Sequence, residues 1–202
     1  QRPLILKKTD SSAQLGVEML PPPFSVEALK AAAGDVKPCS HIVSELVPDP
    51  LLWYPDPQNR KDGRKFHIRA YLLVHFNAGR AYAHMSDLTR VLTASKPYVE
   101  GEWDDKDIHL SGGSRTTQWW SWDAEHVGWT QAQKEEADAQ IRAVMIPIAK
   151  SIAATYKPFR ECNAGFKFYG LDLMLSRDGR LWLIEVNNRP SWSSLVIQTE
   201  RT

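Results

Sequence analysis

The sequence predicts an α+β fold, in which the strands of antiparallel sheets are interrupted by helices. Apolar residues alternate over residues 65–76 and 171–186, which is the pattern of strands with one buried face. A helical spacing of apolar residues begins near Thr130. Helices and strands do not alternate regularly, and the glycine-rich dinucleotide fingerprint is missing from the sequence. These observations disfavour a doubly wound parallel sheet.

The composition is that of a globular protein without a general affinity for nucleic acid. The chain has 202 residues, of which 43% are hydrophobic and 24% are charged. Its 25 Lys and Arg nearly balance its 24 Asp and Glu, so any anion site must be local and no nucleic-acid partner is expected. Cys39 and Cys162 fit neither a disulfide framework nor a zinc site, and we expect reduced, buried thiols. With no signal peptide and no apolar run of about 18 residues, we expect a cytoplasmic protein that does not enter membranes.

Residues 1–48 are predicted to form three strands and one helix. The helix has Ser25 as its N-cap and stops at Gly34. Prolines end the third strand. The strands are expected at residues 3–7, 15–20 and 40–47.

A polar, proline-bearing stretch at residues 49–64 is predicted to be a loop or flexible insertion before the next strand. A turn at Asn77-Ala78-Gly79 joins the strand at 65–76 to a second strand at 80–85. From residue 86 to residue 129 no clear periodicity is present, and irregular structure is expected.

The long helix is predicted to start with a capping box formed by Thr130 and Gln133. Pro147 is expected to kink it. Its buried stripe is predicted to contain Ile141, Val144, Met145, Ile148 and Ile152.

Two carboxylates interrupt the last predicted hairpin. If Asp178 and Gly179 are its two loop residues, Asp172 lies directly opposite Glu185 and both point to the same face. Opposed like charges destabilise an antiparallel pair, and the hairpin face offers no evident cationic side chain to offset them.

A bound cation would offset the repulsion. Asn187 falls on the same face, opposite Gly170, which leaves space. Carboxylate and amide oxygens are ligands for hard divalent cations, and proteins usually hold Mg²⁺ with one or two carboxylates plus substrate phosphates. A hairpin whose charges simply face solvent is the alternative interpretation.

Basic side chains in two places could meet the phosphates of a nucleotide. Lys7 ends a strand before a loop rich in small polar residues, although it could also be a solvated surface lysine. Lys65, His67 and Arg69 share one face of their strand, as an anion-binding ridge or as a charged edge strand.

Other stretches have less specific interpretations. The strand that ends with Leu46 and Val47 could offer backbone groups and apolar walls to an adenine ring. His109 is expected to be a packed loop histidine. A tryptophan cluster could grip a peptide, but packing in the core is the favoured interpretation; it contains Trp119, Trp120, Trp122 and Trp129.

In chain order, these stretches resemble the tubulin–tyrosine ligase-like family, a branch of the ATP-grasp ligases. The most specific match is FYGLDLMLSRDGRLWLIEVNNRPS, followed by KFHIRAYLLV. The remaining matches are ILK with LGV after it, SELVPDPLL, TASKPY and HLS. The resemblance implies an ATP-grasp-like fold, in which residues 1–48 are part of the central subdomain and residues 65–202 form the carboxy-terminal subdomain with the metal site. The family's amino-terminal domain has no counterpart here, and because the chain begins with Gln1 rather than Met we expect that this domain is missing.

The resemblance also implies an activity. Members of this family are ATP- and Mg²⁺-dependent ligases, which convert a carboxylate to an acyl-phosphate and let the amine of a free amino acid attack it. A protein substrate is implied, such as tubulin or another acidic chain, together with association with the cytoskeleton.

Residue roles follow by matching the motifs. The resemblance assigns the catalytic arginines to Arg69 and Arg90 and the Mg²⁺ ligands to Asp172, Glu185 and Asn187. It assigns nucleotide binding to Lys7, Ser44, Glu45, Leu46, Val47, Lys65 and the neighbouring position His67.

Two departures from the family pattern favour an alternative function. The family usually has Asp where this chain has His67, and Thr-Asn after the histidine-leucine pair where this chain has Ser111 and Gly112. ATP binding tolerates both changes better than ligation does. The alternative is a nucleotide-binding pseudoenzyme that serves as a protein-interaction module, with the tryptophan cluster as its contact surface.

Overall fold

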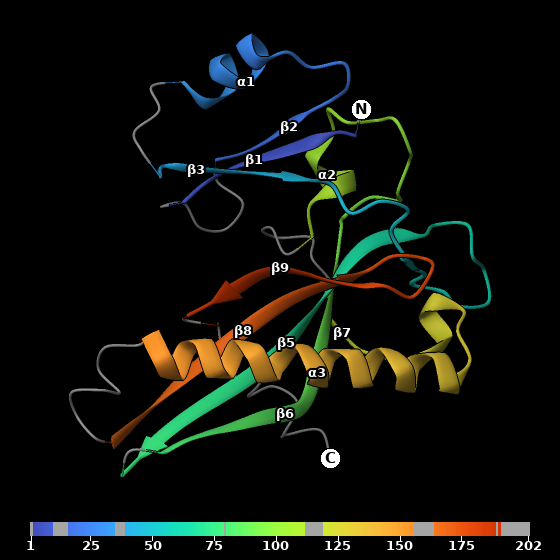
Figure 1. Cartoon of the computed structure of the whole chain (residues 1–202). Helices are drawn as coiled ribbons and strands as arrows, with labels where there is room; N and C mark the ends of the chain where they lie inside the picture. The colour runs from blue at the N-terminus through green and yellow to red at the C-terminus, as the bar shows by residue number, and fades with distance from the viewer. Residues whose placement is uncertain are drawn as a thin grey trace.

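The computed structural model describes residues 2–9, 16–34, 39–78, 80–111, 119–155, 164–188 and 190. In this part of the chain, two antiparallel sheets are combined with helices, as the α+β prediction requires. Figure 1 shows the smaller sheet at one end of the molecule and the larger sheet at the other, with a long helix across one face of the larger sheet.

The smaller sheet and its helix follow the prediction closely. Its strand order is β2-β1-β3, with β1 at Leu4–Lys8, β2 at Val17–Leu20 and β3 at His41–Glu45. Helix α1 spans Val26–Ala33; the Ser25 hydroxyl accepts a hydrogen bond from the Ala28 N–H, and Gly34 ends the helix with a positive φ of 64°. β3 stops two residues earlier than predicted, and the Leu46 N–H donates to the Pro3 carbonyl.

Cys39 is exposed, so the prediction of a buried thiol is wrong at this position. Its backbone has a positive φ of 64° in the turn that leads into β3, which places it at the surface. Cys162 lies outside the described residues.

The larger sheet has the strand order β7-β6-β5-β8-β9, and a short strand β4 also pairs with β5. The bounds are Leu52–Trp53 for β4, Arg64–Asn77 for β5, Arg80–Thr93 for β6, Trp119–Ser121 for β7, Ala164–Leu175 for β8 and Leu181–Asn187 for β9. The helices in this part are α2 at Lys106–His109, the 3₁₀ helix η1 at Glu125–Val127 and α3 at Gln131–Thr155.

The segment 49–64 is predicted to be a loop or flexible insertion, and one part of it packs into the larger sheet, while residues 55–62 form mostly exposed bends and turns. It contributes β4, and Trp53 is completely buried in the core. The Trp53 ring stacks on His126 with centroids 4.4 Å apart and also contacts Phe66. The prolines and polar residues around β4 obscure a strand of only two residues.

The stretch from residue 86 contains more regular structure than predicted. β6 continues to Thr93, and β7, α2 and η1 follow it. The register between β5 and β6 shifts between Ala70 and Leu72. This irregularity interrupts the alternation of β6 and explains why the sequence pattern fades there.

Helix α3 begins as predicted. The Thr130 N–H donates to the Gln133 side chain, and the Gln133 N–H donates to the Thr130 hydroxyl. The helix continues through Pro147 to Thr155. Ile141 and Met145 are buried, and the other predicted stripe residues pack against the same core; these are Val144, Ile148 and Ile152.

The last hairpin pairs Asp172 with Glu185 as predicted, although its loop and its strand register differ from the prediction. Near the turn, Leu175 pairs with Leu181, which leaves a larger loop than the predicted Asp178-Gly179 pair. A register shift after Asp172 then adds one residue on β9 and restores the predicted pairing.

The two faces of β5 have different chemistry. Phe66, Ile68, Ala70, Leu72 and Val74 belong to the buried core that includes residues of α3. The alternate positions, which begin with Lys65, lie on the opposite face. β5 therefore separates the hydrophobic core from the candidate site.

Candidate functional site

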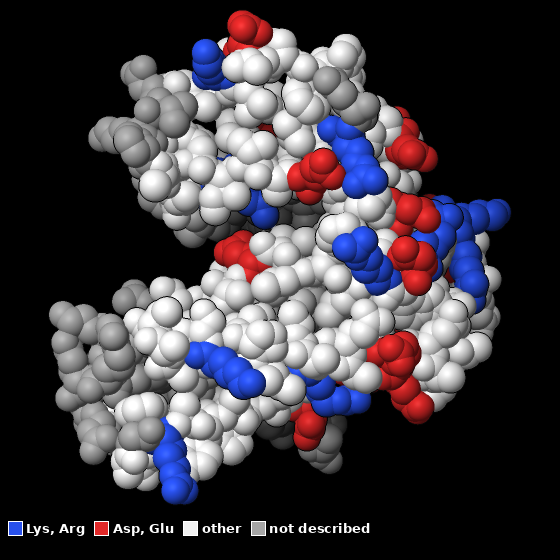
Figure 2. Space-filling model, in the orientation of Figure 1, with Lys and Arg blue, Asp and Glu red and all other residues white. Residues whose placement is uncertain are grey.

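The candidate site is a polar surface on neighbouring strands of the larger sheet. Arg69 pairs with Arg90 on β6 and with Asp172 on β8, and Asp172 pairs with Glu185 on β9. Figure 2 shows a hollow between the part that carries β1–β3 and the part that carries β9, with Lys or Arg atoms above it and Asp or Glu atoms below it. The topology thus gathers residues that are far apart in the sequence.

Arg69 binds the Asp172 carboxylate with two hydrogen bonds. The Nε–Oδ1 distance is 2.5 Å and the Nη2–Oδ2 distance is 2.8 Å. Burial acts to lower the pKa of Arg69, but the hydrogen bond and negative charge of Asp172 outweigh it and raise this pKa. The Asp172 charge is therefore offset by a cation from β5, a strand outside the hairpin, so the repulsion expected between Asp172 and Glu185 is reduced without a metal.

Asn187 and Glu185, the other two predicted metal ligands, differ in their contacts. The Asn187 amide donates to Asp172 Oδ2 at 3.1 Å. Glu185 is exposed and lies opposite Asp172 across β8 and β9. Asp172, Glu185 and Asn187 thus offer carboxylate and amide oxygens at one place, which fits the ligand chemistry of Mg²⁺.

Gly170 is needed for close packing, and the predicted empty space beside it is filled. A Cβ atom at this position would lie 3.0 Å from Cδ of Arg69 and 3.0 Å from Cβ of Pro190. The Arg69 side chain therefore crosses Gly170 on its way to Asp172.

His67 is almost completely buried between Ser111 and Asp172. Its Nδ1 atom is 2.7 Å from the Ser111 hydroxyl, and its Nε2 atom is 3.6 Å from Asp172 Oδ1. Burial lowers the pKa of His67 to about 4, against the opposing effect of Asp172 and with help from the charges of Arg69 and Lys7. Lys7 is a half-buried residue of β1, and its charge contributes to the lowered pKa of His67.

Lys65 is a buried lysine at the start of the same face. Only 2% of it is exposed, and burial lowers its pKa to about 8. Its Nζ donates to His109 Nδ1 at 3.3 Å and lies 5.3 Å from the Tyr98 ring centre. His109 belongs to the short helix α2 rather than to a loop, and it is packed as predicted. A buried ammonium without a carboxylate partner among these contacts suits an anionic ligand.

A cavity of about 290 Å³ adjoins Lys65. Leu46 and Val47 line it, but Ser44 and Glu45 are exposed on β3 and are not among the lining residues. Glu45 instead forms a surface ion pair with Arg2. The structure therefore brings two of the four predicted hinge residues to the cavity.

Tyr71 and Tyr98 also lie beside the predicted residues but are not predicted from the sequence. Tyr71 continues the alternate positions of β5 opposite Gly170, and it is buried. Burial raises its pKa, and the charges of Arg90 and Arg69 oppose this effect. The alternation could have revealed Tyr71, whereas Tyr98 lies in a loop where no periodicity marks it.

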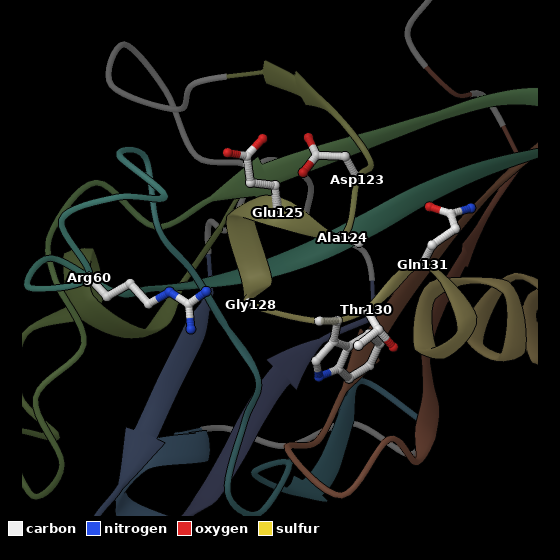
Figure 3. A pocket seen from close by; sticks show the side chains of 8 residues that line it. Arg60, Asp123, Ala124, Glu125, Gly128, Thr130 and Gln131 are labelled. Atoms are coloured by element: carbon white, nitrogen blue, oxygen red, sulfur yellow. The ribbon is translucent and has the colours of Figure 1, made fainter.

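A second, larger hollow lies away from these residues. It has a volume of about 500 Å³ at the start of α3 and η1. Figure 3 shows Arg60 on one side of it, with Asp123 and Glu125 on another. None of the predicted catalytic, nucleotide-binding or metal-binding residues lines this hollow, although Trp129 of the tryptophan cluster does.

The tryptophan cluster belongs mainly to the core. Trp122 is buried, and Trp120 and Trp129 pack against the same core cluster. The side chain of Trp119 and the residues Gly112 and Gly113 lie outside the described part of the chain. Packing therefore explains three of the four tryptophans.

Comparison with known proteins agrees with the motifs. Residues 25–200 match the model of the tubulin-tyrosine ligase family. A probable alpha-tubulin polyglutamylase of Tetrahymena thermophila is 25% identical over 203 residues, which cover 93% of this chain and 44% of that protein. The chain thus spans less than half the length of this curated relative. Within its described part, no helix combines the length and apolar character needed to cross a membrane. The chain belongs to the tubulin-tyrosine ligase family.

Proposed function

We propose that this chain forms the nucleotide-binding part of an ATP- and Mg²⁺-dependent carboxylate–amine ligase that adds an amino acid to a protein. The observation that carries the proposal is the arrangement of Arg69, Asp172 and Asn187 on one sheet face, with the buried Lys65 beside it. Family membership supports the same class of reaction.

Each group has a role in this proposal. Lys7 and Lys65 bind phosphate or ribose oxygens, and the cavity at Leu46 and Val47 takes the adenine ring. Asp172, Glu185 and Asn187 would hold Mg²⁺, which neutralises phosphate charge when it is bound. In this proposal, residues 1–48 belong to the central subdomain of an ATP-grasp-like fold and residues 65–202 form its carboxy-terminal subdomain.

The chemistry requires positioning and charge neutralisation. A carboxylate oxygen of the protein substrate attacks the γ-phosphorus of ATP, which forms an acyl-phosphate and releases ADP. The amine of a free amino acid then attacks the acyl carbon, phosphate leaves, and the amine loses a proton as the amide forms. Arg69 and Arg90, which pair across β5 and β6, are assigned to stabilise the negative charge of the transferring phosphoryl group.

The protein substrate is proposed to be tubulin or another acidic chain. The name of the Tetrahymena relative refers to alpha-tubulin, and this supports tubulin as the first substrate to test. A cytoplasmic location with access to the cytoskeleton follows from this proposal.

A nucleotide-binding pseudoenzyme is the second candidate function. The buried position of His67, where the family pattern has a carboxylate, favours it. The burial of the tryptophan cluster removes part of its proposed contact surface. This candidate therefore rests on the altered site rather than on an exposed aromatic patch.

An ADP-release assay separates the two candidates. The assay uses tubulin and acidic peptides as acceptors and a panel of free amino acids, with Asp172→Asn as the inactive control. A ligase releases ADP over many turnovers only when both an acceptor and one amino acid are present, because the acyl-phosphate formed in the first step needs an amine to complete the reaction. Nucleotide binding without such dependent ADP release would support the pseudoenzyme and contradict the ligase.

A further inference from the structure

The two ring nitrogens of His67 differ in their hydrogen bonding. Nδ1 contacts the Ser111 hydroxyl at 2.7 Å. Nε2 is buried and has no hydrogen-bond partner among the described residues. An unpaired polar atom in a buried position is costly, so a partner is expected when the site is filled.

The distance between His67 Nε2 and Asp172 suits a shared metal ion better than a direct hydrogen bond. Nε2 lies 3.6 Å from Asp172 Oδ1, which is beyond hydrogen-bond distance. Two ligand atoms at about 2.1 Å from one ion are separated by roughly 3.0–3.4 Å in octahedral or tetrahedral geometry. A small movement would therefore let one ion bind both atoms.

The surroundings of His67 match those of a metal-binding histidine. Such a histidine usually uses its other ring nitrogen in a hydrogen bond that fixes the ring. Ser111 provides this bond at Nδ1. If Nδ1 carries the proton and the Ser111 oxygen accepts it, Nε2 presents its lone pair to Asp172.

The protein cannot hold the ion with these side chains alone. Among the described residues, no group of three or more His, Cys, Asp and Glu side chains is placed to bind a metal. Asp172 also accepts hydrogen bonds from Arg69 and Asn187, although each carboxylate oxygen can accept more than one interaction. Phosphate oxygens of a nucleotide must therefore complete the ligand set.

We propose that His67 Nε2 is a nitrogen ligand to the nucleotide-bound ion, so that the site favours a divalent transition-metal ion such as Mn²⁺ over Mg²⁺. Mg²⁺ prefers oxygen ligands, whereas imidazole nitrogen binds transition metals well. This inference rests on the proposed nucleotide site and adds a ligand to it. Ser111 acts as a positioning residue, because it touches His67 and not the ion.

Pulsed electron paramagnetic resonance of Mn²⁺ tests separately whether the ion binds the nucleotide phosphates and whether a histidine nitrogen is its ligand. The protein is freed of metal and mixed with Mn²⁺ and a non-hydrolysable ATP analogue. A phosphorus-31 coupling reports an ion on the nucleotide phosphates, and a nitrogen-14 coupling reports an imidazole ligand. Labelling histidine with nitrogen-15 must replace the nitrogen-14 signal, which identifies histidine without any substitution.

Variants identify which histidine is responsible. His67→Asn should keep the phosphorus coupling and lose the nitrogen coupling. His75→Gln, on the same strand face, is the matched control and should keep both. His67→Asp should lower the preference for Mn²⁺ over Mg²⁺ by about tenfold in competition titrations.

The outcomes distinguish the inference from the proposed function. Phosphorus coupling without histidine nitrogen coupling in the unmodified protein would overturn the inference and leave the nucleotide site intact. Protein that binds neither Mn²⁺ nor the analogue would contradict both. A nitrogen signal that persists in His67→Asn and disappears in His75→Gln would also overturn the assignment to His67.

Discussion

Arg69 and Asp172 lie directly opposite each other on β5 and β8, and two hydrogen bonds join them. Their side chains are only 15% and 11% exposed, so this pair is shielded from solvent. The carboxylate that the sequence marks as a metal ligand is thus already bound to a cation. A metal and a nucleotide must share Asp172 with Arg69 or displace it.

Replacing Asp172→Asn should lower the free energy of unfolding by about 3–5 kcal/mol, because it leaves the shielded Arg69 charge without a counterion. Urea denaturation measures this change. Glu45→Gln is the matched control, since the Arg2–Glu45 pair is 59% and 61% exposed and should contribute about 1 kcal/mol at most. Equal effects of the two substitutions would show that the shielded Arg69–Asp172 pair contributes no more to stability than the exposed Arg2–Glu45 pair.

Glu185→Gln should change the stability of the free protein by less than about 0.5 kcal/mol, because Glu185 is exposed. The variant should nevertheless lose the Mg²⁺-dependent part of the stabilisation by ATP. In a protein with an intact site, a ligand concentration a hundredfold above Kd raises the free energy of unfolding by about 2.7 kcal/mol. Melting curves with Mg²⁺–ATP and with ATP plus a chelator measure the difference; a full Mg²⁺ effect in the variant would remove Glu185 from the metal site.

Gly170→Ala should disturb the site through packing. The new Cβ would lie 3.0 Å from Arg69 Cδ and from Pro190 Cβ, so Arg69 must shift away from its position over β8. We expect a loss of about 1–3 kcal/mol in stability and weaker nucleotide binding. Gly34→Ala is the control, because it strains a positive φ without any neighbour within 4 Å and should destabilise without affecting nucleotide affinity. Unchanged nucleotide affinity in Gly170→Ala would show that nucleotide binding does not depend on the position of Arg69.

Much of the fold could be predicted because local patterns determine it. The cap at Ser25, the capping box at Thr130 and the alternation of β5 each depend on neighbouring residues in the chain. The second half of β6 could not be predicted, because a register shift hides its alternation. β4 was missed because two residues are too few to show a period.

The candidate site shows the same limit. The pairing of Asp172 with Glu185 was predicted from an assumed two-residue turn, and it holds because the register shift on β9 compensates for a longer loop. The Arg69–Asp172 pair was not predicted, because it depends on β5 lying next to β8 in the sheet. Side-chain partners across a sheet require the strand order, which hairpin patterns do not supply.

Trp53→Ala should destabilise the protein by about 3–5 kcal/mol, because the side chain is completely buried against His126 and Phe66. Chemical denaturation measures the loss. Gln58→Ala, at an exposed position of the same segment, should change stability by about 0.5 kcal/mol or less. A small effect of Trp53→Ala would instead support the flexible insertion that the sequence predicted.

Lys65 should make stability depend on pH in the metal-free protein. Its pKa is about 8 in the folded state, compared with an ordinary value of 10.5. Between these two values the unfolded chain binds more protons than the folded protein does, so stability rises with pH. Below about pH 8 both states are protonated and the folded state carries the full cost of a buried ammonium.

Lys65→Met keeps a side chain of similar length and removes the charge, so it should abolish this contribution. The free energy of unfolding of the unmodified protein, minus that of the variant, should increase by roughly 2 kcal/mol from pH 7.5 to pH 9.5. Taking the difference cancels other groups that titrate equally in both proteins. Denaturation curves at several pH values, in the presence of a chelator, measure it. A difference that stays constant would mean that the Lys65 charge is already compensated in the free protein, and the burial of Lys65 would then not indicate a site for an anionic ligand.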